Sequence, residues 1–181
     1  RALASHDTVS TPEGGERIVT AALDAFGRLD VLINNAGILR NSALTELPND
    51  DIDALIDVHL KGHFATSRFA ASYWRLKSKE TGAPVNGKIV NTASESGLYG
   101  NAGQANYAAA KAGIASMTIV MARELERIGV RVNATAPNSV PAAVSTDRTS
   151  DAIVRLDEGR SNGMLVVVDG AADTEMALLE Q

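Results

Sequence analysis

The stretch that decides the fold is Leu29-Asp30-Val31-Leu32-Ile33-Asn34, a short, almost continuous aliphatic run that is followed by Asn35-Ala36-Gly37. Such a run has the length and composition of a buried β-strand. Upstream, a helix is expected to begin at Ser10-Thr11-Pro12, with Ser10 or Thr11 as its capping residue, and to end at Gly27. A helix followed directly by a buried strand is typical of an α/β protein.

The same alternation continues along the chain. We expect helices over residues 50–76 and 106–128, strands over 88–92, 130–134 and 164–168, and polar or turn-rich loops over 77–87 and 138–150. In the first long helix, one face is expected to carry the apolar residues Ile52, Leu55, Ile56, Leu60 and Phe64. Aliphatic strands between helices predict a parallel sheet covered on both faces, which is a doubly wound, Rossmann-type α/β fold.

Composition excludes several classes of protein. The 181 residues favour a single domain, and the net charge of −5 disfavours a nucleic-acid binder, which needs a basic face. The absence of cysteine excludes disulfides, thiolate metal sites and a cysteine nucleophile. No apolar run reaches the roughly 18 residues of a membrane span, so we expect a soluble, cytoplasmic protein. With only 4% aromatic residues, its core should be aliphatic and rich in alanine.

The residues that follow each strand form the candidate site, because ligands of open parallel sheets bind beyond the carboxyl ends of the strands. These positions are 34–37, 93–97 and 136–140, and each is rich in small or polar residues.

Tyr107 and Lys111 stand four residues apart, so their side chains share one face of the second long helix. A free tyrosine has a pKa of about 10, and a neighbouring ammonium stabilises the phenolate, which favours proton exchange with an alcohol or carbonyl oxygen. Taken alone, this spacing more often marks a surface pair. Ser94, just beyond an expected strand, either donates a hydrogen bond to the same substrate oxygen or simply ends the strand.

The chain resembles the short-chain dehydrogenase/reductase family in the order and spacing of Asn34-Asn35-Ala36-Gly37, Ser94, Tyr107-x-x-x-Lys111 and Pro137. The resemblance implies an NAD(P)-dependent oxidoreductase, with NAD favoured over NADP, that interconverts a secondary alcohol and a ketone. It implies that Tyr107 is the general acid/base, that Ser94 orients the substrate oxygen, and that Lys111 supports Tyr107 and binds the nicotinamide ribose.

The same resemblance implies a set of cofactor-binding residues. Asn34 and Ala36 would line the cofactor groove, and Asp7 and Thr8, at the end of a preceding strand, would lie near the adenine. Pro137 and Val140 would face the nicotinamide, beside Tyr107 and Lys111. The two long helices would form the contact of a homodimer or homotetramer.

Two departures from the family pattern narrow the resemblance. His59 stands where an asparagine often holds a proton-relay water, and Pro137-Asn138 replaces the frequent Pro-Gly. With residues 24–30 and 100–107, these features resemble the branch that contains the (3R)-hydroxyacyl-CoA dehydrogenase unit of multifunctional β-oxidation enzymes and 3-oxoacyl reductase-like proteins. A 3-hydroxyacyl or 3-oxoacyl thioester is therefore the implied substrate, in fatty acid metabolism. Either the His59 side chain or its backbone would hold the relay water.

Other interpretations are weaker. His59 and His63 have metal-ligand spacing, but Leu60 replaces the glutamate of His-Glu-x-x-His and no third ligand is evident, so we expect no metal site. We expect His59 to be packed or to serve the relay, and His63 to lie on the surface. The Gly-x-Ser-x-Gly motif of hydrolases is absent around Ser94. A non-enzymatic alternative is a catalytically silent scaffold or oligomerisation module.

A glycine-rich phosphate-binding turn between a strand and a helix is not found in the sequence, since Gly97, Gly100 and Gly103 have neither the spacing nor the position. In the resembled family this turn lies upstream of Asp7. Our hypothesis is that residues 1–181 form a single Rossmann-type short-chain dehydrogenase domain that is incomplete at its N-terminus, with a shortened substrate lid after Ser139.

Overall fold

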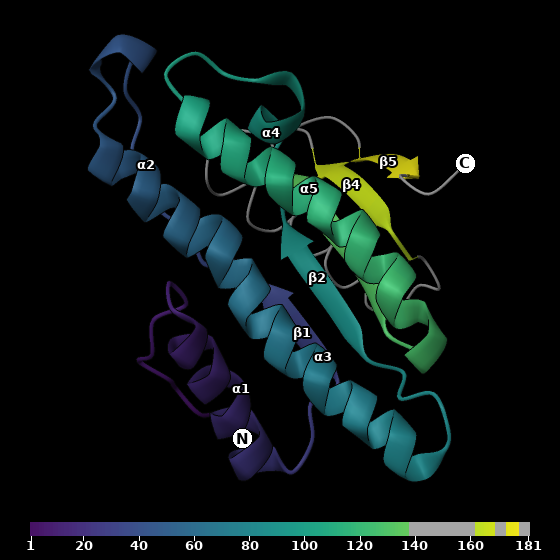
Figure 1. The fold of residues 1–181 in the computed structure, drawn as a ribbon. Coiled ribbons are helices and arrows are strands. Elements are labelled where there is room, and N and C mark those ends of the chain that lie inside the picture. The colour runs from purple at the N-terminus through teal and green to yellow at the C-terminus, as the bar shows by residue number, and fades with distance from the viewer. Residues whose placement is uncertain (138–161, 169–172, 178–181) are drawn as a thin grey trace.

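The computed structural model describes residues 1–137, 162–168 and 173–177, and its centre is a five-stranded sheet (Figure 1). The strands lie in chain order: β1 (Val31–Asn34), β2 (Lys88–Thr92), β3 (Arg131–Pro137), β4 (Met164–Val168) and β5 (Asp173–Ala177). The first four are parallel, whereas β5 runs antiparallel to β4. This sequential order is that of one half of a doubly wound sheet, and the expected Rossmann-type α/β fold is confirmed.

Two long helices, α3 (Gly62–Thr81) and α5 (Ala105–Leu125), lie side by side across one face of the sheet (Figure 1). Each connects neighbouring parallel strands by a crossover in the same direction, and right-handed crossovers then place both helices on the same face. The helix α1 (Pro12–Phe26) packs along the side of α3 that faces away from α5. The shorter elements are η1 (Leu44–Glu46), α2 (Asn49–Leu55), α4 (Ser96–Tyr99) and η3 (Glu126–Ile128).

The start of α1 resolves the choice between the two capping residues. The Thr11 hydroxyl accepts a hydrogen bond from the Gly14 backbone N–H at 3.1 Å, so Thr11 is the cap. At the other end Gly27 adopts a left-handed conformation and its N–H donates to the Leu23 carbonyl, as the sequence predicted.

The first long helix differs from the expectation in two places. It continues to Thr81, so residues 77–81, which were expected in a loop, are helical. Residues Ile56–Lys61 form a π-helical turn, η2, between α2 and α3. A π-helical turn holds an extra residue, so the residues beyond it are rotated relative to a regular helix. Phe64, expected on the apolar face, is therefore 50% exposed, and the prediction that His63 lies on the surface is wrong, because His63 is 2% exposed.

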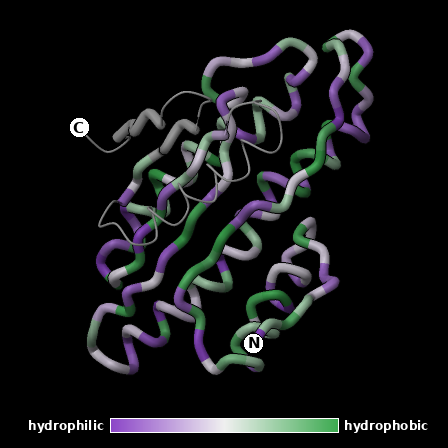
Figure 2. Tube along the Cα trace, turned by 180° about the vertical axis from the view of Figure 1, so that it is seen from behind, coloured by the Kyte–Doolittle hydropathy of each residue, from purple (hydrophilic) through white to green (hydrophobic). Residues whose placement is uncertain are grey.

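The core is aliphatic and rich in alanine, as expected. One cluster joins α5 to the ends of β2 and β3, and its buried members are Ala93, Ile114, Ala115, Met117, Ala134 and Ala136. A second cluster surrounds Trp74, whose indole N–H donates to the Leu29 carbonyl at 2.8 Å. Viewed from behind, long hydrophobic segments run through the middle of the molecule and hydrophilic ones are frequent in its loops (Figure 2).

One further expectation is wrong, and one strand of the structure was not expected. The residues around Asp7 and Thr8 were expected to end a preceding strand, but residues 1–8 contain no strand. The antiparallel strand β5 was not expected, because Asp173-Thr174-Glu175-Met176-Ala177 lacks a strand-like aliphatic pattern. Among the residues that the structure describes, no helix is both long and apolar enough to cross a membrane.

Candidate active site

The end of β2 and the start of α5, which α4 connects, bring Ser94, Tyr107 and Lys111 together. Ser94 lies two residues beyond this strand, and the other two residues stand on the first turns of α5. Between them, Gly97 of α4 packs directly onto α5. A methyl group at this glycine would lie 2.7 Å from the Ala112 nitrogen and the Lys111 carbonyl carbon, so a larger residue would push the two helices apart.

Lys111 is a buried cation next to Tyr107. Its side chain is 3% exposed, and its Nζ donates a hydrogen bond to the Thr92 carbonyl and lies 5.6 Å from the centre of the Tyr107 ring. Burial lowers the pKa of the Lys111 ammonium to about 8, so the group remains mostly protonated at pH 7. The arrangement places a positive charge beside the phenol, as the spacing of four predicted.

Ser94 is buried but only loosely held. Its hydroxyl accepts a hydrogen bond from the Ser96 N–H at 3.2 Å and donates a long one, of 3.5 Å, to the Pro137 carbonyl. A hydrogen bond of that length is weak, so the hydroxyl proton is available to a better acceptor. Pro137 therefore lies against Ser94, at the carboxyl end of β3.

Two buried histidines lie near these groups, His59 against Tyr107 and His63 against Thr92. The His59 ring meets the Tyr107 ring edge to face, with 5.3 Å between the ring centres and an angle of 89°. The His63 Nε2 accepts a hydrogen bond from the Thr92 N–H at 3.4 Å. Burial, and then the charge of Lys111, lower the pKa of the His63 imidazole to about 3. Within the described residues, no group of three or more histidine, aspartate or glutamate side chains could hold a metal ion.

Asn34 lies beside the site, but its side chain is engaged in the core. Its amide donates to Ser67 Oγ at 2.9 Å and to Asn91 Oδ1 at 3.0 Å, and its oxygen accepts from Thr66 Oγ1 at 2.6 Å. It therefore holds β1, β2 and α3 together. Ala36, two residues further on, is exposed at the corner where β1 ends.

The residues expected near the adenine are held by other contacts. Asp7 forms an exposed ion pair with Arg17 of α1, with 2.6 Å between carboxylate and guanidinium, and this hydrogen bond lowers the pKa of the Asp7 carboxyl. Thr8 Oγ1 accepts from the Ser10 N–H at 3.1 Å. Val140, expected to face the nicotinamide, lies outside the described residues.

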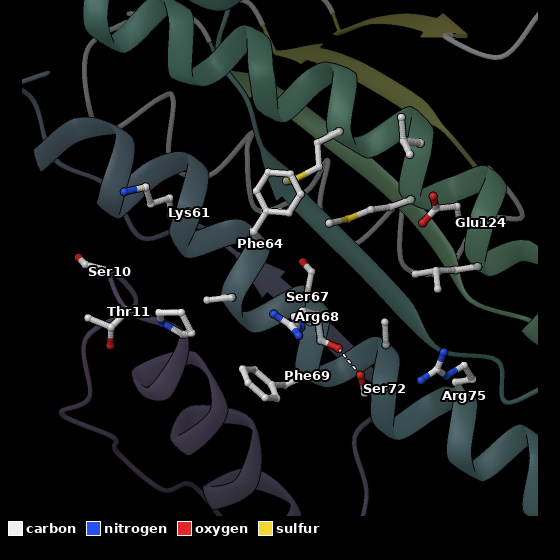
Figure 3. Close-up of a pocket in the computed structure, with 17 residues that line it drawn as sticks. Ser10, Thr11, Lys61, Phe64, Ser67, Arg68, Phe69, Ser72, Arg75 and Glu124 are labelled. Atoms are coloured by element: carbon white, nitrogen blue, oxygen red, sulfur yellow. Dashed lines mark hydrogen bonds between the residues drawn. The ribbon is translucent and has the colours of Figure 1, made fainter. Parts of the chain in front are cut away.

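A separate groove of about 920 Å³ opens between α3 and α5 and reaches the start of α1, and none of Ser94, Tyr107 and Lys111 lines it (Figure 3). Phe64 and Val120 line it and are about half exposed. Charged groups also border it, namely Lys61, Arg68, Arg75 and Glu124. The site chemistry and this apolar groove are thus different features of the molecule.

Comparison with known proteins decides the family. The family model described as short chain dehydrogenase matches residues 1–153. The chain belongs to the short-chain dehydrogenase family. A short chain dehydrogenase from Mycobacterium avium has a crystal structure that matches with a TM-score of 0.90 and 40% identity, over 97% of this chain and 64% of that one.

Curated relatives of this short-chain dehydrogenase carry names from one area of chemistry. Hydroxyacyl-CoA dehydrogenase ChsB1 of Mycobacterium tuberculosis is 45% identical over 77% of this chain and 44% of its own length. The peroxisomal hydratase-dehydrogenase-epimerase of Saccharomyces cerevisiae is 43% identical over 75% of this chain and 14% of its own. The 3-oxoacyl-[acyl-carrier-protein] reductase FabG of Thermotoga maritima is 43% identical over 69% of this chain and 48% of its own length. The chain thus spans less than half the length of these relatives.

Two buried residues beside the site of this short-chain dehydrogenase were not expected from the sequence. His63 is buried because the π-helical turn rotates the residues that follow it, and no local sequence signal indicates that turn. Asn91 lies in the expected strand, and an amide inside an aliphatic run is a signal for a buried polar partner. Its Nδ2 donates to Thr118 Oγ1 at 2.9 Å and extends the Asn34 network to α5.

Proposed function

We propose that this short-chain dehydrogenase is an NAD(P)-dependent oxidoreductase that interconverts a secondary alcohol and a ketone. The observation that carries the proposal is the gathering of a loosely held hydroxyl, a phenol and a buried ammonium, namely Ser94, Tyr107 and Lys111, at one end of the sheet. These three groups suffice to hold and protonate one oxygen atom of a substrate.

The chain's own residues divide the work on that oxygen. Ser94 Oγ–H exchanges its long bond to Pro137 for a hydrogen bond to the substrate oxygen, which orients and polarises it. The Tyr107 hydroxyl gives its proton to this oxygen in reduction, and the Tyr107 phenolate takes the proton from this oxygen in oxidation. The Lys111 ammonium stabilises the negative charge that Tyr107 carries between these events.

A nicotinamide cofactor fits the corner next to these groups. Ala36 is small and exposed, so a flat ring can approach the backbone of this corner closely. Gly37 lets the same backbone lie against the His59 ring, since a methyl group there would be 2.5 Å from it. Tyr107, Lys111, Pro137 and Val140 would lie at the nicotinamide end. Asn34 and Ala36 would line the cofactor groove, and Asp7 and Thr8 would lie near the adenine. When bound, the cofactor supplies or accepts the hydride. NAD is our choice over NADP.

The proposed substrate is a 3-hydroxyacyl or 3-oxoacyl thioester, and the proposed setting is fatty acid metabolism. The names of the relatives support this choice, since they are those of a hydroxyacyl-CoA dehydrogenase, a multifunctional enzyme and a 3-oxoacyl reductase. The alternative of a catalytically silent scaffold finds no support in these comparisons. We also propose that residues 1–181 belong to one Rossmann-type domain, which acts in the cytoplasm.

The test is the variant Tyr107→Phe in the longest polypeptide that contains this sequence. We expect oxidation of 3-hydroxybutyryl-CoA with NAD⁺ or NADP⁺, followed at 340 nm, to fall by a factor of roughly 10² to 10⁴, because the proton carrier is lost. Tyr73→Phe is the matched control, since Tyr73 packs against the Trp74 cluster on α3 and should keep its activity. Unchanged turnover in Tyr107→Phe would refute the assignment.

A further inference from the structure

His59 occupies an unusual place in the helix that leads to α3. It lies in η2, the π-helical turn, and its side chain is 2% exposed. Single π-helical turns inside α-helices occur frequently at functional sites, because the extra residue redirects a side chain. Here the redirected imidazole lies between the corner that follows β1 and the first turn of α5.

On one side, the imidazole binds the backbone of the corner. Its Nε2 lies 2.7 Å from the Ile38 carbonyl oxygen and 3.0 Å from the Ile38 nitrogen. The shorter contact is with the acceptor, so we assign the proton to Nε2, which donates to the carbonyl. The ring also lies on the Gly37 backbone, where a methyl group would come within 2.5 Å of Cε1. The position of the corner is thus coupled to the position of the ring.

On the other side, the imidazole meets Tyr107. The two rings are in edge-to-face contact, with 5.3 Å between their centres. Nδ1 of His59 has no hydrogen-bond partner in the described part of the chain, so Nε2 alone anchors the ring. A phenylalanine could make the same ring contact with Tyr107 but not the hydrogen bond with Ile38, and this hydrogen bond is the reason for a histidine here.

The electrostatic surroundings keep this imidazole neutral. Burial lowers the pKa of His59, the hydrogen bond to Ile38 opposes this change, and the positive charge of Lys111 lowers the pKa further. A neutral ring can lie beside the buried ammonium without repelling it. His59 is thus suited to hold its neighbours rather than to carry the proton itself.

We propose that His59 is a positioning residue: its hydrogen bond to Ile38 fixes the imidazole, and the imidazole fixes the orientation of the Tyr107 ring relative to the corner after β1. This inference rests on the proposed function, in which Tyr107 moves the proton and the corner borders the cofactor. The role is distinct from holding a relay water, since it needs only the contacts that the structure contains.

Two variants separate the parts of this role. His59→Phe keeps an aromatic ring but cannot donate to Ile38, whereas His59→Gln places an amide N–H near the position of Nε2. His6→Phe, at an exposed histidine, is the matched control. We expect His59→Phe to lower kcat for 3-hydroxybutyryl-CoA at least tenfold with KM changed less than threefold, His59→Gln to recover kcat to within threefold, and His6→Phe to resemble the parent protein.

A second measurement does not depend on turnover. The chain has three tyrosines, so the ring signals of Tyr107 in ¹³C-tyrosine-labelled, ligand-free protein can be assigned with Tyr107→Phe. We expect ¹³C relaxation to show greater mobility of the Tyr107 ring in His59→Phe and parent-like mobility in His59→Gln. Unchanged ring mobility in His59→Phe, or a loss of kcat that glutamine does not restore, would overturn the inference. If the parent protein oxidises no thioester, the proposed function fails, and ring mobility alone decides the role of His59.

Discussion

Thr92 shows how single side chains complete the backbone at the edge of the site. β1 ends at Asn34, which pairs with Asn91, so Thr92 extends one residue beyond the neighbouring strand. Its N–H is bound by the His63 ring and its carbonyl by Lys111. Buried backbone groups need such partners, and here two titratable side chains take the place of a strand. The hydrogen bond from Lys111 to the Thr92 carbonyl therefore does two things: it positions the ammonium, and it gives the strand end a partner.

This arrangement predicts a pH dependence of stability that originates in His63. An unfolded chain binds a proton at this imidazole below its ordinary pKa of 6.5, whereas the folded chain does so only below about 3. Between these values the unfolded state holds more protons, so lowering the pH favours unfolding, by at most about 1.4 kcal/mol per pH unit for one group.

The measurement is urea unfolding between pH 6.5 and pH 4. We expect the free energy of unfolding of the parent protein to fall more steeply with decreasing pH than that of His63→Gln, in which this group cannot titrate. Comparing the two slopes removes the contribution of the carboxylates, which both proteins share. His6→Gln, at the exposed histidine, should keep the parent slope. Equal slopes in the parent and His63→Gln would contradict the burial of a neutral His63.

At the scale of elements, the sequence predicted the strand bounds and helix ends that depend on neighbouring residues in the chain. The strands at 88–92 and 164–168 have the bounds expected from their aliphatic runs. The helix α1 begins after its capping residue Thr11 and ends at Gly27, as capping preferences predict. The π-helical turn at Ile56–Lys61 has no such local signal. Its register depends on which side chains the β1 corner and α5 accept, and this tertiary choice exchanged the environments of His63 and Phe64.

The candidate site was predictable to a similar extent. Spacing and order brought Ser94, Tyr107 and Lys111 together, because each follows a strand end or opens a helix. The sequence did not reveal that the Asn34 side-chain amide donates hydrogen bonds to Ser67 and Asn91 in a buried network. It also did not reveal the ring contact of His59 with Tyr107. Contacts between residues far apart in the chain arise only when the elements pack.

The capping of α1 gives a prediction at this scale. Thr11→Ala removes the acceptor for the Gly14 N–H, and we expect it to lower the free energy of unfolding by about 1 kcal/mol. Ser10→Ala is the matched control, because Ser10 takes part through its backbone N–H, which alanine retains. Chemical denaturation followed by circular dichroism measures both. A loss of the same size in Ser10→Ala would show that the cap is assigned to the wrong residue.

At the scale of the whole molecule, α5 contributes to two different features, the candidate site and the groove. Its first turns carry Tyr107 and Lys111 toward the ends of the strands, while Val120 and Glu124 line the groove shared with α3 (Figure 3). A half-exposed valine and phenylalanine in one apolar groove favour a protein surface as its occupant. We propose a second copy of this chain, joined through α3 and α5 in a homodimer or homotetramer, since these helices present both cationic groups and the carboxylate of Glu124 to the same groove.

This proposal predicts that Val120→Glu dissociates the oligomer. A carboxylate buried between two copies would lose its hydration without gaining a designed partner, and such burial strongly disfavours association. Size-exclusion chromatography with light scattering should give the mass of a multimer for the parent protein and of a monomer for the variant. Leu44→Glu provides the matched control, because Leu44 is 75% exposed in η1, outside the groove, and should leave the mass unchanged. Because Tyr107 and Lys111 face the strand ends and not the groove, a parent protein that is itself monomeric would refute the oligomer while leaving the proposed chemistry intact.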